Sequence, residues 1–149
     1  MKTIVLIISL LVISAGYAID MERFLKEAQE QLTEESLKLD QKLDARLPVF
    51  SQATAGKVEN RKIEHVSFSE AIFIIGDDPI SREWLKKHAR ELEEKHALGF
   101  VTNIRDSAHL QTLQALTKAP LLPANIDDLM TLFKESHYPL VFFGSELWQ

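Results

Sequence analysis

Two adjacent carboxylates, Asp77 and Asp78, are the residues of this chain best placed to do chemistry. They follow the apolar run Ile72–Ile75 and Gly76, and Pro79 then opens a segment with helical patterning. This order is typical of a buried strand that leads into a helix in an α/β domain. Ligands and partners of such domains meet the carboxyl ends of the strands. Carboxylates in that position can hold Mg²⁺ or act as an aspartyl nucleophile.

A metal site there would draw a further acid from another strand end. Asp106 follows the strand expected at Leu98–Asn103, and Glu146 follows the last expected strand, so Asp77, Asp106 and Glu146 form a candidate triad. A simpler interpretation involves no chemistry. Acidic side chains stabilise helix N-termini, because they accept hydrogen bonds from free N–H groups and interact favourably with the helix dipole.

Other chemistries have little support in the sequence. The chain has no cysteine, which excludes thiol–disulfide chemistry, a cysteine nucleophile and cysteine-bound zinc. It has no GxSxG, HExxH or glycine-rich phosphate motif. We therefore expect no cofactor, no metal and no enzyme activity, with a divalent-metal enzyme that uses Asp77 and Asp78 as the alternative. The histidines, none four residues from another, are His65, His88, His96, His109 and His137.

The first residues predict export. Lys2 precedes the apolar run Ile4–Ile13, and small residues lead up to Ala18, which is the pattern of a secretory signal peptide over residues 1–18. The run is too short to span a bilayer comfortably, so an uncleaved membrane anchor and a core strand are the lesser alternatives. We expect a periplasmic protein. The formal net charge of −5 and the lack of long basic clusters make nucleic acid an unexpected partner.

The rest of the chain divides into three parts. Residues 19–47 contain a long amphipathic helix, Met21–Leu47, which either packs on its own domain or pairs with a partner or a second copy. Residues 48–60 read as a linker or loop, because they are small and polar and lack periodicity. Residues 61–149 form the compact domain.

Strand and helix patterns alternate within that domain, which predicts βαβ crossovers and a mostly parallel sheet. Gly99 is expected near the end of the first helix, and Asn125 as the N-cap of the third helix, with Leu129, Leu132 and Phe133 inward. The expected strands are Ala71–Ile75, Leu98–Asn103, Pro120–Pro123 and Pro139–Gly144, with a tail at Glu146–Gln149 that can pair with the last; the expected helices are Ser81–His96, Ser107–Leu116 and Ile126–Ser136.

Three segments, GDDPISREWL, GFVTN and HYPLVFF, resemble those of a small exported protein family of integrating conjugative elements. Members of that family are encoded beside mating-pair (type IV secretion) genes and have no established biochemical activity. The resemblance covers Pro48–Gln149. It implies a component of a conjugative apparatus whose partners are other type IV secretion or mating-pair proteins.

The C-terminal domain is in turn similar to the thioredoxin-like periplasmic subunit of conjugative pilus assembly. That similarity implies a degenerate thioredoxin-like α/β domain in which Asp77–Ser81 replace the dithiol and Pro139 is the cis proline, although an ordinary trans proline also suits the first residue of a strand. Redox activity cannot carry over without Cys-x-x-Cys. A groove beside the proline that binds extended polypeptide can carry over from the thioredoxin-like subunit.

We therefore expect a non-enzymatic periplasmic docking module of a conjugative type IV secretion apparatus. Self-association through Met21–Leu47 is a second expected contact, and a membrane contact is expected only if the signal peptide stays uncleaved. A further alternative, which assigns no specific function, is a secreted α/β protein unrelated to conjugation. The expected docking face consists of Asp77, Asp78, Trp84, His137, Tyr138 and Pro139.

Overall fold

The computed structural model describes residues 23, 25–31, 33–34, 37–38, 41–42 and 44–149. The chain divides into two units, residues 1–41 and residues 42–149. The expected signal peptide lies outside the described residues, and the expected helix over residues 21–47 lies partly outside them. The described positions between 23 and 44 have helical backbone. No helix formed by the described residues is both long and apolar enough to cross a membrane.

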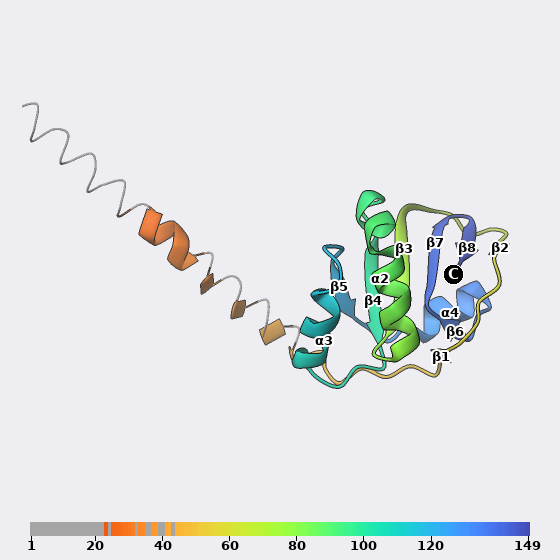
Figure 1. Cartoon of the computed structure of the whole chain (residues 1–149), viewed down its shortest axis with the longest axis horizontal. Helices are drawn as coiled ribbons and strands as arrows, with labels where there is room; N and C mark the ends of the chain where they lie inside the picture. The colour runs from red at the N-terminus through yellow and green to blue at the C-terminus, as the bar shows by residue number, and fades with distance from the viewer. Residues whose placement is uncertain (1–22, 24, 32, 35–36, 39–40, 43) are drawn as a thin grey trace, which may run out of the picture. The chain divides into compact units, whose positions relative to one another are not determined.

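The second unit is a mixed α/β domain (Figure 1). Its six-stranded sheet has the order β2-β8-β7-β3-β4-β5, and a separate pair joins β1 to β6. The strands are β1 (Thr54–Ala55), β2 (Arg61–Lys62), β3 (Phe68–Gly76), β4 (Leu98–Thr102), β5 (Leu121–Pro123), β6 (His137–Tyr138), β7 (Leu140–Gly144) and β8 (Glu146–Trp148); the helices are α2 (Pro79–Glu94), α3 (Ser107–Gln114) and α4 (Asp127–Phe133).

The sheet is parallel on only one side of its central strand. β3 is parallel to β4 and β4 to β5, but β3–β7, β7–β8 and β8–β2 are antiparallel. The expectation of a mostly parallel sheet was therefore wrong. Ser145 alone separates β7 from β8, after Gly144 at φ +61°, and so short a turn can join only antiparallel strands.

Two apolar clusters lie on the two faces of the sheet. Side chains alternate along β3, so Phe73 and Ile75 pack in the cluster that α2 and α3 cover, whereas Ile72 and Ile74 pack in the cluster that α4 covers. Figure 1 shows α2 crossing in front of the sheet. The continuous apolar run that predicted this strand is thus explained by burial on both faces.

Helix α2 begins at Pro79, before the expected Ser81, and ends without glycine. Asp78 is its N-cap, Pro79 lies in its first turn and Lys95 is its C-cap. Gly99 lies in β4 instead, where an added Cβ would come within 2.3 Å of the Phe73 ring. The glycine is required by close packing against β3, and its expected capping role was wrong.

Helix α4 is shorter than expected, and one of its three expected inward residues is exposed. It ends at Phe133 because Lys134 adopts a left-handed conformation, with φ 52°. Asn125 lies one residue before the N-cap, and its Oδ1 accepts a 2.9 Å hydrogen bond from the Asp127 N–H. Met130 is buried, whereas Leu132, which was expected inward, is 44% exposed. Phe133 is buried and Leu129 packs against the same cluster, both as expected. Ile126 and Met130, at i and i+4, complete the inward stripe with Phe133 at i+7.

Residues 49–58, here called the strap, belong to the compact domain and are not a free linker. Val49 forms an antiparallel bridge with Ile104, and β1 pairs in parallel with β6. Val49, Ala53 and Val58 are buried. The domain therefore starts before the expected Arg61. The strap lacks a recognisable pattern because hydrogen bonds, more than periodic apolar side chains, hold it in place.

Candidate functional site

The junction between β3 and α2 is a closed hydrogen-bonded cap. Asp78 Oδ1 accepts a 2.7 Å hydrogen bond from the Ser81 N–H, and Asp78 Oδ2 accepts one of 2.7 Å from the Ser81 hydroxyl. Ser81 Oγ in turn accepts a 3.0 Å bond from the Gly76 N–H, and Ser81 is fully buried. The side chain of Asp78 is therefore used to begin the helix.

Asp77 faces a different set of partners. It forms an ion pair with Arg82, and its Oδ2 lies 3.9 Å from His109 Nε2. The other ring nitrogen of His109, Nδ1, lies 2.7 Å from Asp106 Oδ1. The backbone N–H of His109, and then its side chain, lower the pKa of Asp106 by bonding the carboxylate. Two members of the candidate triad, Asp77 and Asp106, thus lie on either side of one histidine.

The third member, Glu146, lies elsewhere. It begins β8 beside Lys62, and β7, which leads into it, runs antiparallel to β3 so that Gly144 lies opposite Phe68. Glu146 is therefore near the start of β3, whereas Asp77 follows its end, and the expected triad does not form. Within the described part of the chain, no three acidic or histidine side chains gather where they could hold a metal ion.

Tyr138 closes the other side of the junction. Its ring lies against Gly76, where an added Cβ would be 2.5 Å from Tyr138 Cε2. Its hydroxyl accepts a 2.8 Å hydrogen bond from Asn103 Nδ2. Burial, and to a smaller degree the charge of Asp78, raise the pKa of Tyr138 despite that hydrogen bond. The Tyr138–Pro139 peptide bond is cis.

The six residues of the expected docking face do not share one surface. Trp84 is buried in the cluster under α2, with its ring 6.3 Å from that of Phe73. Tyr138 is buried in the cluster on the opposite face of the sheet, and Pro139 is buried as well. The expectation failed because proximity along the sequence does not show which face of a sheet a side chain takes. Asp77, Asp78 and His137 are partly exposed.

The strap occupies the groove beside Pro139. The Thr54 N–H donates a 3.0 Å hydrogen bond to the Ser136 carbonyl, and the Gly56 N–H donates one of 2.9 Å to the Tyr138 carbonyl. The register pairs Thr54 with His137 in parallel strands. The groove expected to bind a foreign polypeptide therefore holds a segment of the chain itself.

Two amide side chains, which the sequence analysis missed, hold the strap. Asn103 Oδ1 accepts a 3.0 Å hydrogen bond from the Ser51 N–H, and Asn103 Nδ2 donates one of 3.0 Å to the Ala53 carbonyl. Gln149 Nε2 donates to the Gly56 carbonyl at 2.8 Å and to the Pro139 carbonyl at 3.0 Å. Asn103 sits at a left-handed φ of 52° after β4. An asparagine at a strand end was the one local signal available.

The groove restricts the side chains of its occupant. A Cβ added to Gly56 would come within 2.8 Å of His137 Nδ1 and 2.9 Å of its Cγ. Ala53 is only 4% exposed. An extended segment in this groove therefore needs a small residue and, three positions later, a glycine.

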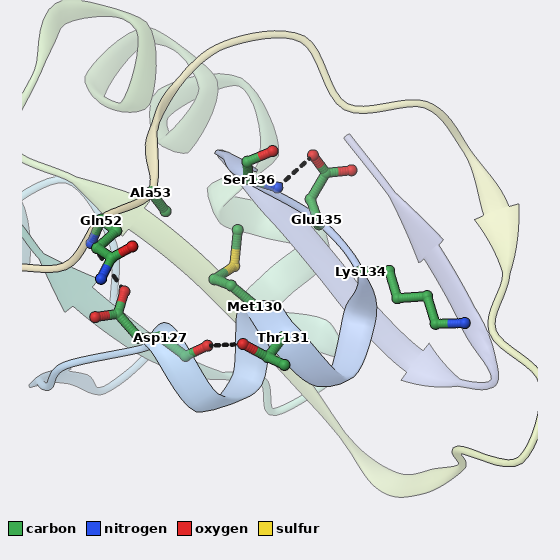
Figure 2. A pocket seen from close by; sticks show the side chains of 8 residues that line it. All are labelled: Gln52, Ala53, Asp127, Met130, Thr131, Lys134, Glu135 and Ser136. Carbon is green, nitrogen blue, oxygen red and sulfur yellow. Dashed lines mark hydrogen bonds between the residues drawn. The ribbon is translucent and has the colours of Figure 1, made fainter.

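An open cavity of about 550 Å³ lies between the strap and α4 (Figure 2). Met130 points into it, with Ala53 nearby. Asp127 at one end accepts a 2.8 Å bond from the Gln52 N–H. Glu135 at the other end accepts from the Ser136 N–H and from Arg61 Nη1, each at 2.9 Å. The carboxylates at its two ends thus accept hydrogen bonds that hold the strap and Arg61 in place.

Exposed apolar side chains occur at the edge where the parallel strands end. Ile80, in the first turn of α2 after β3, is 54% exposed, and Phe50 is 60% exposed. The Phe50 carbonyl accepts a 2.9 Å bond from Asn125, which follows β5. We call the surface that carries Ile80 and Phe50 the C-terminal edge. It is the position at which α/β domains meet their partners.

Comparison with known proteins identified a family but no characterised relative. A family model described as "Protein of unknown function (DUF2859)" matches residues 16–144. Neither a curated protein nor a solved structure matched the chain. The chain belongs to the DUF2859 family.

Proposed function

We propose that this protein is a non-enzymatic, periplasmic docking component of the conjugative type IV secretion apparatus of an integrating conjugative element. The GDDPISREWL, GFVTN and HYPLVFF segments support the link to conjugation through their resemblance. The apolar run and small residues before Ala18 support export.

The compact domain is a degenerate thioredoxin-like domain in this proposal. Support comes from the order of its elements: β3, α2 and β4 form a parallel unit, and Pro139 precedes the antiparallel pair β7–β8. The contact between Gly76 and the Tyr138 ring brings the β3–α2 junction beside that proline. In a thioredoxin-like enzyme, the junction carries the dithiol.

One observation carries the non-enzymatic assignment, namely the closed cap at that junction. Ser81 and Asp78 bond one another and the backbone there. The chain contains no thiol to replace them. Asp78 and Ser81 hold the helix end in place, so neither of these side chains is free to act on a substrate, and this favours a role in binding.

The alternative, a divalent-metal enzyme using Asp77 and Asp78, has weaker support. Arg82 already pairs with Asp77, and Asp78 caps α2. A metal ion would have to displace both interactions, and each displaced group would then lose its charged partner.

The C-terminal edge is the docking surface that the geometry favours. The strap fills the groove beside Pro139, so a partner must bind elsewhere. Ile80 offers an exposed apolar side chain and lies in the sequence between Asp77 and Arg82, which form an ion pair, with Phe50 at the same edge. An apolar anchor with a charged rim is the usual anatomy of a protein–protein contact.

The test compares two matched substitutions. Ile80→Asp places a charge on the C-terminal edge at a helix start that tolerates it, and Leu132→Asp places the same charge on exposed α4. We expect tagged wild-type protein and Leu132→Asp to recover secretion-channel subunits from envelope extracts, and Ile80→Asp to lose them. Recovery of the same subunits with all three proteins would contradict the assigned surface, and recovery of none would contradict the docking role.

A further inference from the structure

The strap is held in a way that suits exchange. Its buried apolar side chains are Val49, Ala53 and Val58, while Phe50 is exposed. Its hydrogen-bond partners include the side chains of Asn103 and Gln149 and the backbone carbonyls of Ser136 and Tyr138. Such bonds contribute little net free energy each because water replaces them when they break. Release of the strap therefore exposes these three apolar side chains and the groove beneath them, while water solvates its hydrogen-bonding groups.

The position of the strap in the chain also suits exchange. It lies at the start of the compact unit, before the remaining strands and helices of the sheet. Glu59 and Asn60, both exposed, connect it to β2. Rotation at this short exposed connection would carry the strap away while the sheet stays intact.

We propose that two copies of this chain exchange their straps, so that residues 49–58 of one copy fill the groove beside Pro139 of the other. The occupant must be small at the position of Ala53 and glycine at the position of Gly56. The strap of an identical chain meets both requirements and restores every hydrogen bond lost on release. Exchange of an identical element is a low-cost route to dimers.

A foreign segment is the less favourable occupant. It would compete with an attached strap whose effective concentration is of the order of millimolar, and it would need the same spacing of small residues. Exchange with a second copy leaves no strap without a groove, because each displaced strap binds the equivalent groove of the other copy. This inference goes beyond the docking role and does not depend on the link to secretion.

The absence of cysteine permits a direct test. Thr54 on the strap and His137 in the groove touch, with Thr54 Oγ1 3.1 Å from His137 Nδ1. Two differently tagged full-length copies are produced together, one carrying Thr54→Cys and the other His137→Cys, and are oxidised. A disulfide between the two tags in excess of the random-collision background requires that the strap of one copy reaches the groove of the other.

Two control pairs accompany this test. Lys57→Cys replaces Thr54→Cys to measure linkage from a strap position that is not paired with His137, because Lys57 is exposed and lies outside β1. A single chain with both Thr54→Cys and His137→Cys shows that the pair can be oxidised at all. We expect the Thr54→Cys and His137→Cys copies to give about tenfold more linked dimer than the Lys57→Cys control, as the high local concentration of exchanged segments requires.

Three outcomes would overturn the inference. Equal, low yields from both mixed pairs, with efficient oxidation inside the double variant, would show a strap fixed in its own chain. A disulfide that links Thr54→Cys to a different protein would assign the groove to another partner. Hydrogen exchange on the unmodified protein provides an independent check. The Thr54 and Gly56 amides must exchange faster than those of β3 and β4, and equal rates would show that the strap opens only on global unfolding.

Discussion

The backbone N–H of Gly56 donates a 2.9 Å hydrogen bond to the carbonyl oxygen of Tyr138. This single bond joins a segment before the sheet to the residue that precedes Pro139. It explains why the groove beside the proline is closed, and it is the reason that we propose the C-terminal edge as the docking surface. The two partners lie more than eighty residues apart, so the relationship belongs to the tertiary structure alone.

The Asp78 cap contributes to stability. We expect Asp78→Ala to lower the free energy of unfolding by about 1–2 kcal/mol, because the Ser81 N–H and hydroxyl lose their acceptor. Guanidinium unfolding followed by circular dichroism measures the change. Asp128→Ala, an exposed acid in the first turn of α4, should cost less than about 0.5 kcal/mol. Similar losses from both variants would show that the cap has no special role.

Trp84 belongs to the core and not to an interface. We expect Trp84→Ala to destabilise the domain by about 3–5 kcal/mol, because it leaves a cavity beside Phe73. Ile80→Ala, at a side chain that is 54% exposed, should cost less than about 1 kcal/mol. Denaturant midpoints of the two variants measure the difference. If Trp84→Ala keeps wild-type stability, the assignment of Trp84 to the core is wrong.

The strongest local signals predicted the centre of the fold. The apolar run at β3 and the Asp-Pro start of α2 depend on residues close together in sequence, and both were confirmed. The short strand expected at Pro120–Pro123 and the pairing of the tail with β7 were confirmed as well.

The candidate site was predictable only in part. The sequence placed Asp77 and Asp78 after a strand, but the opposite placement of Trp84 and Tyr138 depends on the pleat of β3 and on which helix covers each face. The strap escaped prediction because side-chain amides far along the chain satisfy its backbone. The sequence also did not predict that β7 pairs antiparallel to β3, which places Glu146 away from Asp77. The direction of a strand in a sheet is set by packing and not by the local sequence pattern.

Glu135 makes stability depend on pH in the acid range. Burial acts to raise the pKa of this carboxyl, but hydrogen bonds from Arg61 and from the Ser136 and His137 N–H groups outweigh it and lower the pKa. A lowered pKa in the folded state gives stability that is present above the unfolded carboxyl value, about 4.3, and lost as the pH falls through the folded value. Urea midpoints measured between neutral and acid pH should therefore decline less steeply for Glu135→Gln than for the wild type. Parallel declines would contradict the linkage.

Tyr138 should ionise at unusually alkaline pH. Burial and the nearby charge of Asp78 raise its pKa, so the stability it contributes is present below the ordinary tyrosine value and lost as the pH rises through the raised one. The chain has two tyrosines, and Tyr138→Phe leaves only Tyr17. The difference between the phenolate absorbance titrations of the two proteins isolates Tyr138. A midpoint at the ordinary value of about 10 would contradict the buried environment.

Divalent cations should not stabilise the domain. A ligand that binds only the folded state raises the melting temperature, and Asp77 and Asp78 already have partners in Arg82 and Ser81. Thermal unfolding with and without Mg²⁺ or Mn²⁺ should therefore coincide for the wild type and for Asp77→Asn. Stabilisation of the wild type that disappears in Asp77→Asn would favour the metal-enzyme alternative.

The most direct test of the docking role is photo-crosslinking in the cells that produce the protein. A photoreactive residue replaces Ile80 on the C-terminal edge in one strain and Leu132 on α4 in another, and mass spectrometry identifies the adducts. We predict that position 80 links to a subunit of the secretion apparatus and that position 132 does not. The absence of any adduct at position 80 in cells active in conjugation, or the presence of adducts only at position 132, would contradict the central claim.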